Sequence, residues 1–224
     1  MKYTLLIPAF LFCIAAKAQV SSFNIDSTKF NQPLKASLDS IFLADQAPRL
    51  RYMEARQKKE SQTHIDSLRT IMVQEDKRNL AKCLAILEKH GWQGPQKVGM
   101  IGSQALFLVI QHADLETQKK YLPMIREAEN KGEILSSNLA ILEDRINVRE
   151  GKQQLFGSQA FTDKQSGKLY FYPIANIDQL EKNRKRMGLL PMPDYARQLN
   201  IDWDPEVYKK MLPEIEQIVA RQKI

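Results

Sequence analysis

Apolar side chains recur every three or four residues along most of this chain, which is the spacing that buries one face of an α-helix. One stripe starts after Pro33, and a second runs from Ile65 to Leu87 and stops at Gly91, a residue suited to a left-handed helix end. Residues 105–110 are apolar without interruption and indicate a helix buried on most sides, after a Gly/Pro-rich turn. The pattern therefore predicts a chain built mainly of α-helices.

Capping residues predict three further helices. Asp114 can cap one helix, Ser136 or Ser137 can cap a second, and Asp204 can cap a C-terminal amphipathic helix, 205–222. The side-chain oxygens of these residues can accept hydrogen bonds from the unpaired N–H groups of a first helical turn.

The periodicity changes once, between Phe156 and Tyr172, where aromatic residues alternate around a polar turn at 163–168. This alternation is typical of a β-hairpin. The predicted fold class is mainly α: a single-domain helical bundle or helical-hairpin array over residues 33–224, with a small β-hairpin near residues 156–172.

The first 18 residues are typical of a secretory signal peptide, with Lys2 at the start, an apolar segment and a final Ala16-Lys17-Ala18. Residues 19–32 are polar, and we expect a flexible leader there. No later segment offers about 18 uncharged apolar residues, so no membrane span is expected. The sequence thus predicts an exported protein, periplasmic or secreted.

Charge and cysteine content argue against two kinds of function: nucleic-acid binding and catalysis by a cysteine thiol. Loss of residues 1–18 would remove two lysines and lower the formal charge from +7 to +5, without a basic run that would suit nucleic acid. Cys83 would then be the single cysteine left, on an apolar helix face, so we expect a buried and unreactive thiol.

Several polar residues lie on faces that are otherwise apolar: Asp45 with Arg49, Asp76 with Asn79, His112 with Asp114, and Asp144 with Arg145. Buried charges are costly unless they are paired. One interpretation is a structural network, with Asp45 bound to Arg49 and Asp144 bound to an arginine such as Arg184. The other is that these groups converge on one pocket.

Among the three histidines, His112 follows six consecutive apolar residues, and we expect its ring to be partly buried. It is either a hydrogen-bonded core histidine or a general base oriented by a carboxylate, for which Asp45, Asp76 and Asp144 are candidates. The fragment His112-x-Asp114 is a weak metal motif by itself, so neither a metal nor another cofactor is expected.

These residues together resemble an uncharacterised bacterial family, domain of unknown function 6624, over about residues 38–197. The elements that carry the resemblance include Asp45-Gln46-x-x-Arg49, Asp76-x-x-Asn79, Gln111-His112-Ala113-Asp114, Leu142-x-Asp144-Arg145, Gln154-x-x-Gly157-Ser158-Gln159 and Arg184-x-x-x-Gly188-Leu189. The family usually has Gly-Thr-Gln after a tyrosine, where this chain has Gly157-Ser158-Gln159 after Phe156. The resemblance implies that these polar positions belong together, and it implies no activity.

Two functions remain open on the sequence. The first is a hydrolase acting on a small polar or anionic substrate, with His112 as general base and Asp144 or Asp45 orienting it. The second is a non-catalytic binding module for a peptide, glycan or small polar ligand. In either case the expected binding residues are Arg49, Asp76, Asn79, Gln111, Asp114, Arg145, Gln154, Gln159 and Arg184. A partner protein could also dock on helix 205–222.

Overall fold

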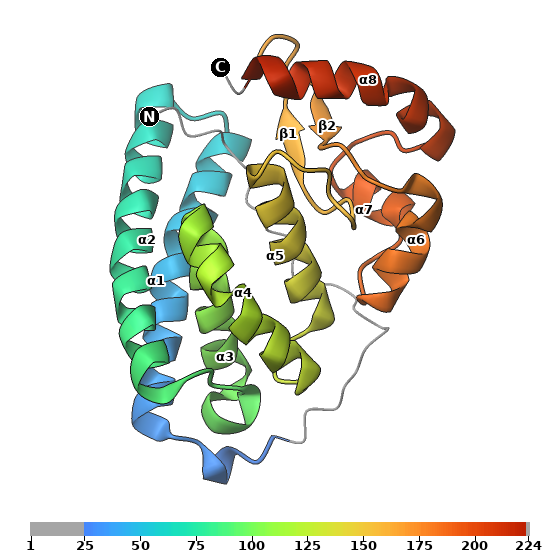
Figure 1. Cartoon of the computed structure of the whole chain (residues 1–224). Coiled ribbons are helices and arrows are strands. Elements are labelled where there is room, and N and C mark those ends of the chain that lie inside the picture. The colour runs from blue at the N-terminus through green and yellow to red at the C-terminus, as the bar shows by residue number, and fades with distance from the viewer. Residues whose placement is uncertain (1–24, 223–224) are drawn as a thin grey trace. The chain divides into compact units, whose positions relative to one another are not determined.

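The computed structural model describes residues 25–222, and it confirms the mainly helical fold class (Figure 1). The described part of the chain holds eight α-helices, one short 3-10 helix and one two-stranded hairpin. The predicted signal peptide, 1–18, and residues 19–24 of the leader lie outside the described residues. The described chain divides between Ile134 and Leu135 into two compact units, here the N-terminal unit and the C-terminal unit. A single domain over 33–224 stays a prediction.

The N-terminal unit is an array of four helices: α1 (Gln32–Gln57), α2 (Gln62–His90), α3 (Pro95–His112) and α4 (Leu115–Asn130). A 3-10 turn, η1 (Ser27–Lys29), precedes α1, whose first turn is capped by the Asn31 side chain. Helix α1 packs against both α2 and α3, and α3 packs against α4 (Figure 1). Helices α1, α2 and α3 therefore pack against one another, and α4 lies against α3.

Two helix boundaries confirm predictions made from single residues: the C-terminal end of α2 at Gly91 and the N-terminal start of α4 after Asp114. Helix α2 ends at Gly91, whose φ of 65° is a conformation that glycine adopts without a steric penalty. The Asp114 side chain accepts a hydrogen bond from Thr117 N at 2.8 Å and caps α4.

Helix α3 begins earlier than predicted, at Pro95, inside the segment expected to be a turn. Gly99 interrupts it with a φ of 72° and a ψ of 171°, so a first turn and the main helix join at a kink. Gly99 does leave the helical conformation, as the predicted turn implied, but it bends a helix instead of separating two elements. Past this kink, Ala105, Leu106 and Ile110 are fully buried.

The C-terminal unit contains α5 (Ser136–Arg149), the hairpin β1 (Ala160–Thr162) with β2 (Leu169–Phe171), α6 (Ile177–Arg186), α7 (Met192–Gln198) and α8 (Pro205–Gln222). The strands are antiparallel, with Phe161 opposite Tyr170, which confirms the predicted hairpin. Ser136 is the first residue of α5, and the cap position is held by Leu135, which has no capping side chain, so the prediction that Ser136 or Ser137 is the cap residue is wrong.

Helix α8 belongs to the core of the C-terminal unit. Its Tyr208, Ile215 and Ile218 are buried in the same cluster as Phe171 and Leu180. The Tyr208 hydroxyl donates to Tyr172 O at 2.8 Å and accepts from Ile174 N at 3.2 Å. Since the apolar face of α8 is buried within its own unit, a partner on this helix would have to use the outer face. That docking stays a prediction.

Among the described helices, none combines the length and the apolar content that a membrane span requires.

Candidate functional site

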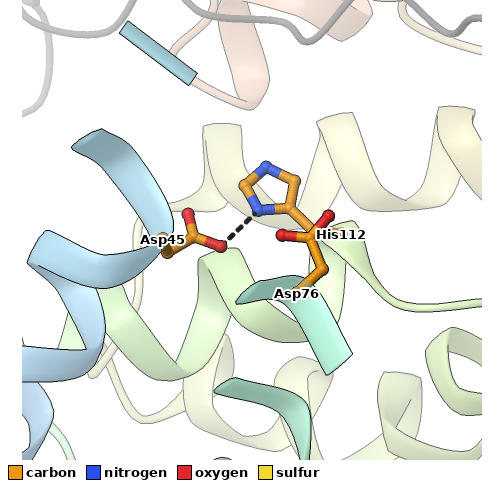
Figure 2. Close-up of side chains that lie close together, drawn as sticks. All are labelled: Asp45, Asp76 and His112. Atoms are coloured by element: carbon orange, nitrogen blue, oxygen red, sulfur yellow. Dashed lines mark hydrogen bonds and ion pairs between the residues drawn. The ribbon is translucent and has the colours of Figure 1, made fainter. Parts of the chain in front are cut away.

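Three helices of the N-terminal unit bring Asp45, Asp76 and His112 together (Figure 2). Asp45 lies in the middle of α1, Asp76 in the middle of α2, and His112 is the last residue of α3. One ligand atom from each of the three side chains lies within 4.8 Å of the other two. Residues separated by 31 and 36 positions in the sequence therefore form one cluster, which we call the Asp-Asp-His cluster.

Asp45 orients the imidazole. His112 Nδ1 lies 2.9 Å from Asp45 Oδ1, and the Asp45 side chain is only 1% exposed. Figure 2 shows the ring with Nδ1 turned toward Asp45 and Nε2 turned away from both carboxylates. A carboxylate at Nδ1 favours the tautomer that carries the proton on Nδ1, and Nε2 is then the basic nitrogen.

Arg49 joins the two carboxylates. Its Nη1 lies 3.2 Å from Asp45 Oδ1 and donates to the Asp45 carbonyl oxygen at 2.7 Å, which is the i, i+4 pair expected from the sequence. Its Nη2 donates to Asp76 Oδ1 at 2.7 Å. Arg49 is 4% exposed, so its charge acts on these two carboxylates with little screening by solvent.

The two carboxylates differ in their electrostatics. Burial by itself would raise the pKa of Asp45, but His112, Arg49 and a hydrogen bond from Gln46 together hold that pKa below its usual range. Burial raises the pKa of Asp76, and the opposing effects of Arg49 and His112 do not fully cancel it. Asp76 is 24% exposed, and it is the most accessible charged group of the cluster.

Two neighbours complete the cluster. Gln46, which the sequence interpretation did not single out as a site residue, donates from Nε2 to Asp45 Oδ2 at 2.5 Å. The signals that could have found it were its place next to Asp45 and its part in the Asp45-Gln46-x-x-Arg49 element of the family resemblance. Asn79, one turn beyond Asp76 on α2, is fully buried, and neither atom of its amide has a hydrogen-bond partner among the described residues.

The other predicted site residues of the N-terminal unit have structural contacts. Asp114 caps α4, and the main-chain oxygen of Gln111 accepts a hydrogen bond from Gln118 Nε2 at 2.6 Å. Cys83 is fully buried, and burial raises the pKa of its thiol to about 12. The expectation of a buried thiol is confirmed.

In the C-terminal unit, Asp144 holds a loop. Its carboxylate is fully buried and accepts hydrogen bonds from the backbone N–H groups of Leu155, Phe156 and Ser158, at 2.6 to 3.2 Å. Burial raises the pKa of Asp144 although these amides oppose the effect. Asp144 was one of the carboxylates proposed to orient His112, and both of its oxygens accept hydrogen bonds from backbone amides of its own loop.

Arg184 donates a hydrogen bond to a backbone carbonyl of the same loop. Its Nη1 donates to Phe156 O at 2.5 Å and its Nε donates to Leu190 O at 2.6 Å. Arg184 therefore bonds to backbone carbonyls, whereas one interpretation of the sequence had paired it with Asp144. Its guanidinium also lies 4.9 Å from the ring centroid of Tyr195, whose hydroxyl donates to Ser158 O at 2.8 Å. Tyr195 is a second residue that the sequence interpretation missed.

Gln154 and Gln159 complete this loop. Gln154 Nε2 donates to the carbonyls of Gln159 and Tyr172, and its Oε1 accepts from Gln159 N at 2.8 Å. Gln159 Nε2 donates to Ser158 Oγ at 3.0 Å. Arg145 is 4% exposed on α5 beside Asp144. The predicted residues thus form two groups, the Asp-Asp-His cluster with Arg49 in one unit and the Asp144 loop in the other.

Comparison with known proteins gives one family. Residues 32–207 match the family described as a family of unknown function (DUF6624). Neither the curated proteins nor the solved structures gave a significant match.

Proposed function

We propose that this chain, which belongs to the family of unknown function DUF6624, is a hydrolase of small polar substrates that uses His112 as general base. The observation that carries the proposal is the 2.9 Å contact between His112 Nδ1 and the buried carboxylate of Asp45. A base whose ring is fixed by a second group is the arrangement that general base catalysis needs.

The reaction follows from the orientation of the ring. Asp45 accepts the Nδ1 proton of His112, so Nε2 can take a proton from a water molecule. The water oxygen adds to the electrophilic carbon or phosphorus of the substrate, and the imidazolium then returns its proton to the leaving group. The positive charge that forms on His112 is stabilised by Asp45 and by the C-terminal end of α3.

Arg49 acts in this proposal as a positioning residue, although the sequence suggested that it binds substrate. Its two terminal nitrogens are engaged by Asp45 and Asp76, and its side chain is almost completely buried. It fixes both carboxylates and, after His112, helps to hold the pKa of Asp45 below its usual range. Asp76, the most accessible charged group, is the candidate for direct contact with the substrate.

The activity can be tested with a panel of chromogenic probes: p-nitrophenyl acetate, p-nitrophenyl phosphate and alanine p-nitroanilide. His112→Asn keeps a donor near Asp45 but lacks the basic nitrogen, and we expect about a 10²-fold or larger loss of turnover. His90→Asn, at the exposed end of α2, is the matched control and should have wild-type turnover. Turnover that survives His112→Asn would contradict the proposal.

The second candidate is a binding module, and Asp76 favours it because an accessible carboxylate can accept hydrogen bonds from a bound ligand without any reaction. A probe that binds without turnover, with affinity lost in Asp76→Asn and retained in His112→Asn, would support the binding module over the hydrolase.

We also propose that the chain is exported to the periplasm or secreted, on the evidence of residues 1–18. Expression of the whole chain in a bacterial host, followed by fractionation and N-terminal sequencing, should give an exported protein that begins at Gln19. An uncleaved chain in the cytoplasmic fraction would contradict this.

A further inference from the structure

The Asp-Asp-His cluster has the chemistry and the spacing of a metal site. A transition metal binds imidazole nitrogen and carboxylate oxygen at about 2.0–2.2 Å, which places neighbouring ligand atoms about 3 Å apart. His112 Nδ1 and Asp45 Oδ1 are separated by 2.9 Å, and one ligand atom of Asp76 lies within 4.8 Å of a ligand atom of each of the other two residues. A small movement of the Asp76 side chain would complete a three-ligand site.

The carboxylates already have the outer hydrogen bonds that metal ligands need. Gln46 binds Asp45 through Oδ2, and Arg49 Nη2 binds Asp76 through Oδ1. Asp76 Oδ2 and Asp45 Oδ1 are then the oxygens that would coordinate the ion; Asp45 Oδ1 faces His112 and also lies 3.2 Å from Arg49 Nη1. Outer-shell donors of this kind orient ligands and raise metal affinity.

Asn79 is a second and independent indication of a ligand. Asp76, Asn79 and Cys83 follow one another at helical spacing on one face of α2. The Asp45 carboxylate acts electrostatically on both Asp76 and Cys83, so Asn79 lies between two residues that face α1. Its fully buried amide has no partner among the described residues, and an unpaired buried amide of this kind is costly unless a bound water molecule or ligand satisfies it.

The charge and the ligand types select the class of metal. Two carboxylates against one guanidinium leave a net charge of −1 before the imidazole is counted, which favours a divalent cation. An imidazole ligand favours Zn²⁺, Mn²⁺ or Co²⁺ over Mg²⁺ and Ca²⁺, which prefer oxygen ligands alone.

We propose that Asp45, Asp76 and His112 bind one divalent transition-metal ion, and that this ion inhibits the proposed hydrolase. Metal on Nδ1 moves the imidazole proton to Nε2, and an imidazole with that tautomer cannot take a proton from water. The binding step stands on the cluster geometry alone, whereas the inhibition rests on the proposed function.

Calorimetry with Zn²⁺, and absorption spectroscopy with Co²⁺, test binding on the metal-free whole chain. We expect one ion per chain and about a 10-fold or larger loss of affinity in Asp76→Asn and in His112→Asn. Glu75→Gln, one residue from Asp76, and His90→Asn are the matched controls and should bind as the wild type does. Gln46→Ala should weaken binding by about 10-fold while the three ligands remain.

Each outcome decides one part of the proposal. If Zn²⁺ produces no heat and Co²⁺ no ligand-field bands, or if Asp76→Asn binds as tightly as Glu75→Gln, the metal site is overturned and the hydrolase proposal is untouched. If one ion binds and the turnover of the chromogenic probes does not fall, the inhibition is overturned while the site stands. If turnover rises with Zn²⁺, His112 is not the base and both the inhibition and the proposed mechanism fail.

Discussion

Arg49→Met tests whether one guanidinium holds the buried carboxylates of the N-terminal unit together. The substitution keeps most of the side-chain volume and removes the bonds to Asp45 and Asp76. Breaking a buried ion pair by removing one partner typically costs about 3–5 kcal/mol. Asp45 keeps its contacts with Gln46 and His112, and Asp76 is partly hydrated at 24% exposure, so we expect a loss near the lower end, about 3 kcal/mol.

The chain offers its own reporters for this measurement. Trp92 belongs to the N-terminal unit and Trp203 to the C-terminal unit, so Trp203→Phe and Trp92→Phe backgrounds follow each unit separately. Urea titration by fluorescence should show the loss in the Trp92 signal. A thermal melt should show a melting temperature lower by about 12 °C, since a unit of about 110 residues unfolds with an entropy of about 2.1 cal/mol/K per residue.

Two further variants decide the interpretation. Arg51→Met, on the exposed side of the same helix, is the control and should change stability by no more than about 1 kcal/mol. Arg49→Met combined with Asp76→Asn should recover part of the loss, because one of the unpaired charges is gone. If Arg49→Met is no more destabilising than Arg51→Met, the guanidinium does not hold the cluster together, and its ion pairs do not stabilise the N-terminal unit.

Other variants probe the rest of the molecule. Asp144→Asn should destabilise the C-terminal unit by about 2–3 kcal/mol, seen in Trp203 fluorescence, since one loop amide loses a charged acceptor; an unchanged urea midpoint would count against the loop assignment. The Ser166 hydroxyl, and then Arg221, hold the pKa of Asp163 well below its usual range, so the stability from this carboxylate is present above about pH 4 and is lost as the pH falls further. Asp163→Asn should therefore flatten the fall in stability between about pH 5 and pH 2 in acid-titrated urea melts, and parallel curves would oppose this. Cys83, with a pKa of about 12, should be alkylated by iodoacetamide only in urea, as peptide mass mapping can show; alkylation of the folded chain would mean the thiol is accessible.

Local signals in the sequence determined most of the secondary structure. Asp114 caps α4 and Gly91 ends α2 because a capping oxygen and a positive φ are properties of single residues. The hairpin follows for the same reason, since alternation and turn chemistry act over a few positions. Gly99 shows the limit: whether a glycine ends a helix or bends it depends on what the next turn packs against, which is a tertiary property.

The sequence also singled out the residues of the Asp-Asp-His cluster and the pair of Asp45 with Arg49, but not the partner of the imidazole. Apolar periodicity singled out Asp45, Asp76, His112 and Asp144, because a charged residue on an apolar face needs a partner. Which carboxylate would meet the imidazole depended on how three separate helices pack, and no local pattern encodes that distance. In the tertiary structure Asp45 contacts His112, and Asp144 accepts hydrogen bonds from the amides of its own loop. Each carboxylate bonds to the donors that packing brings within about 3 Å of it.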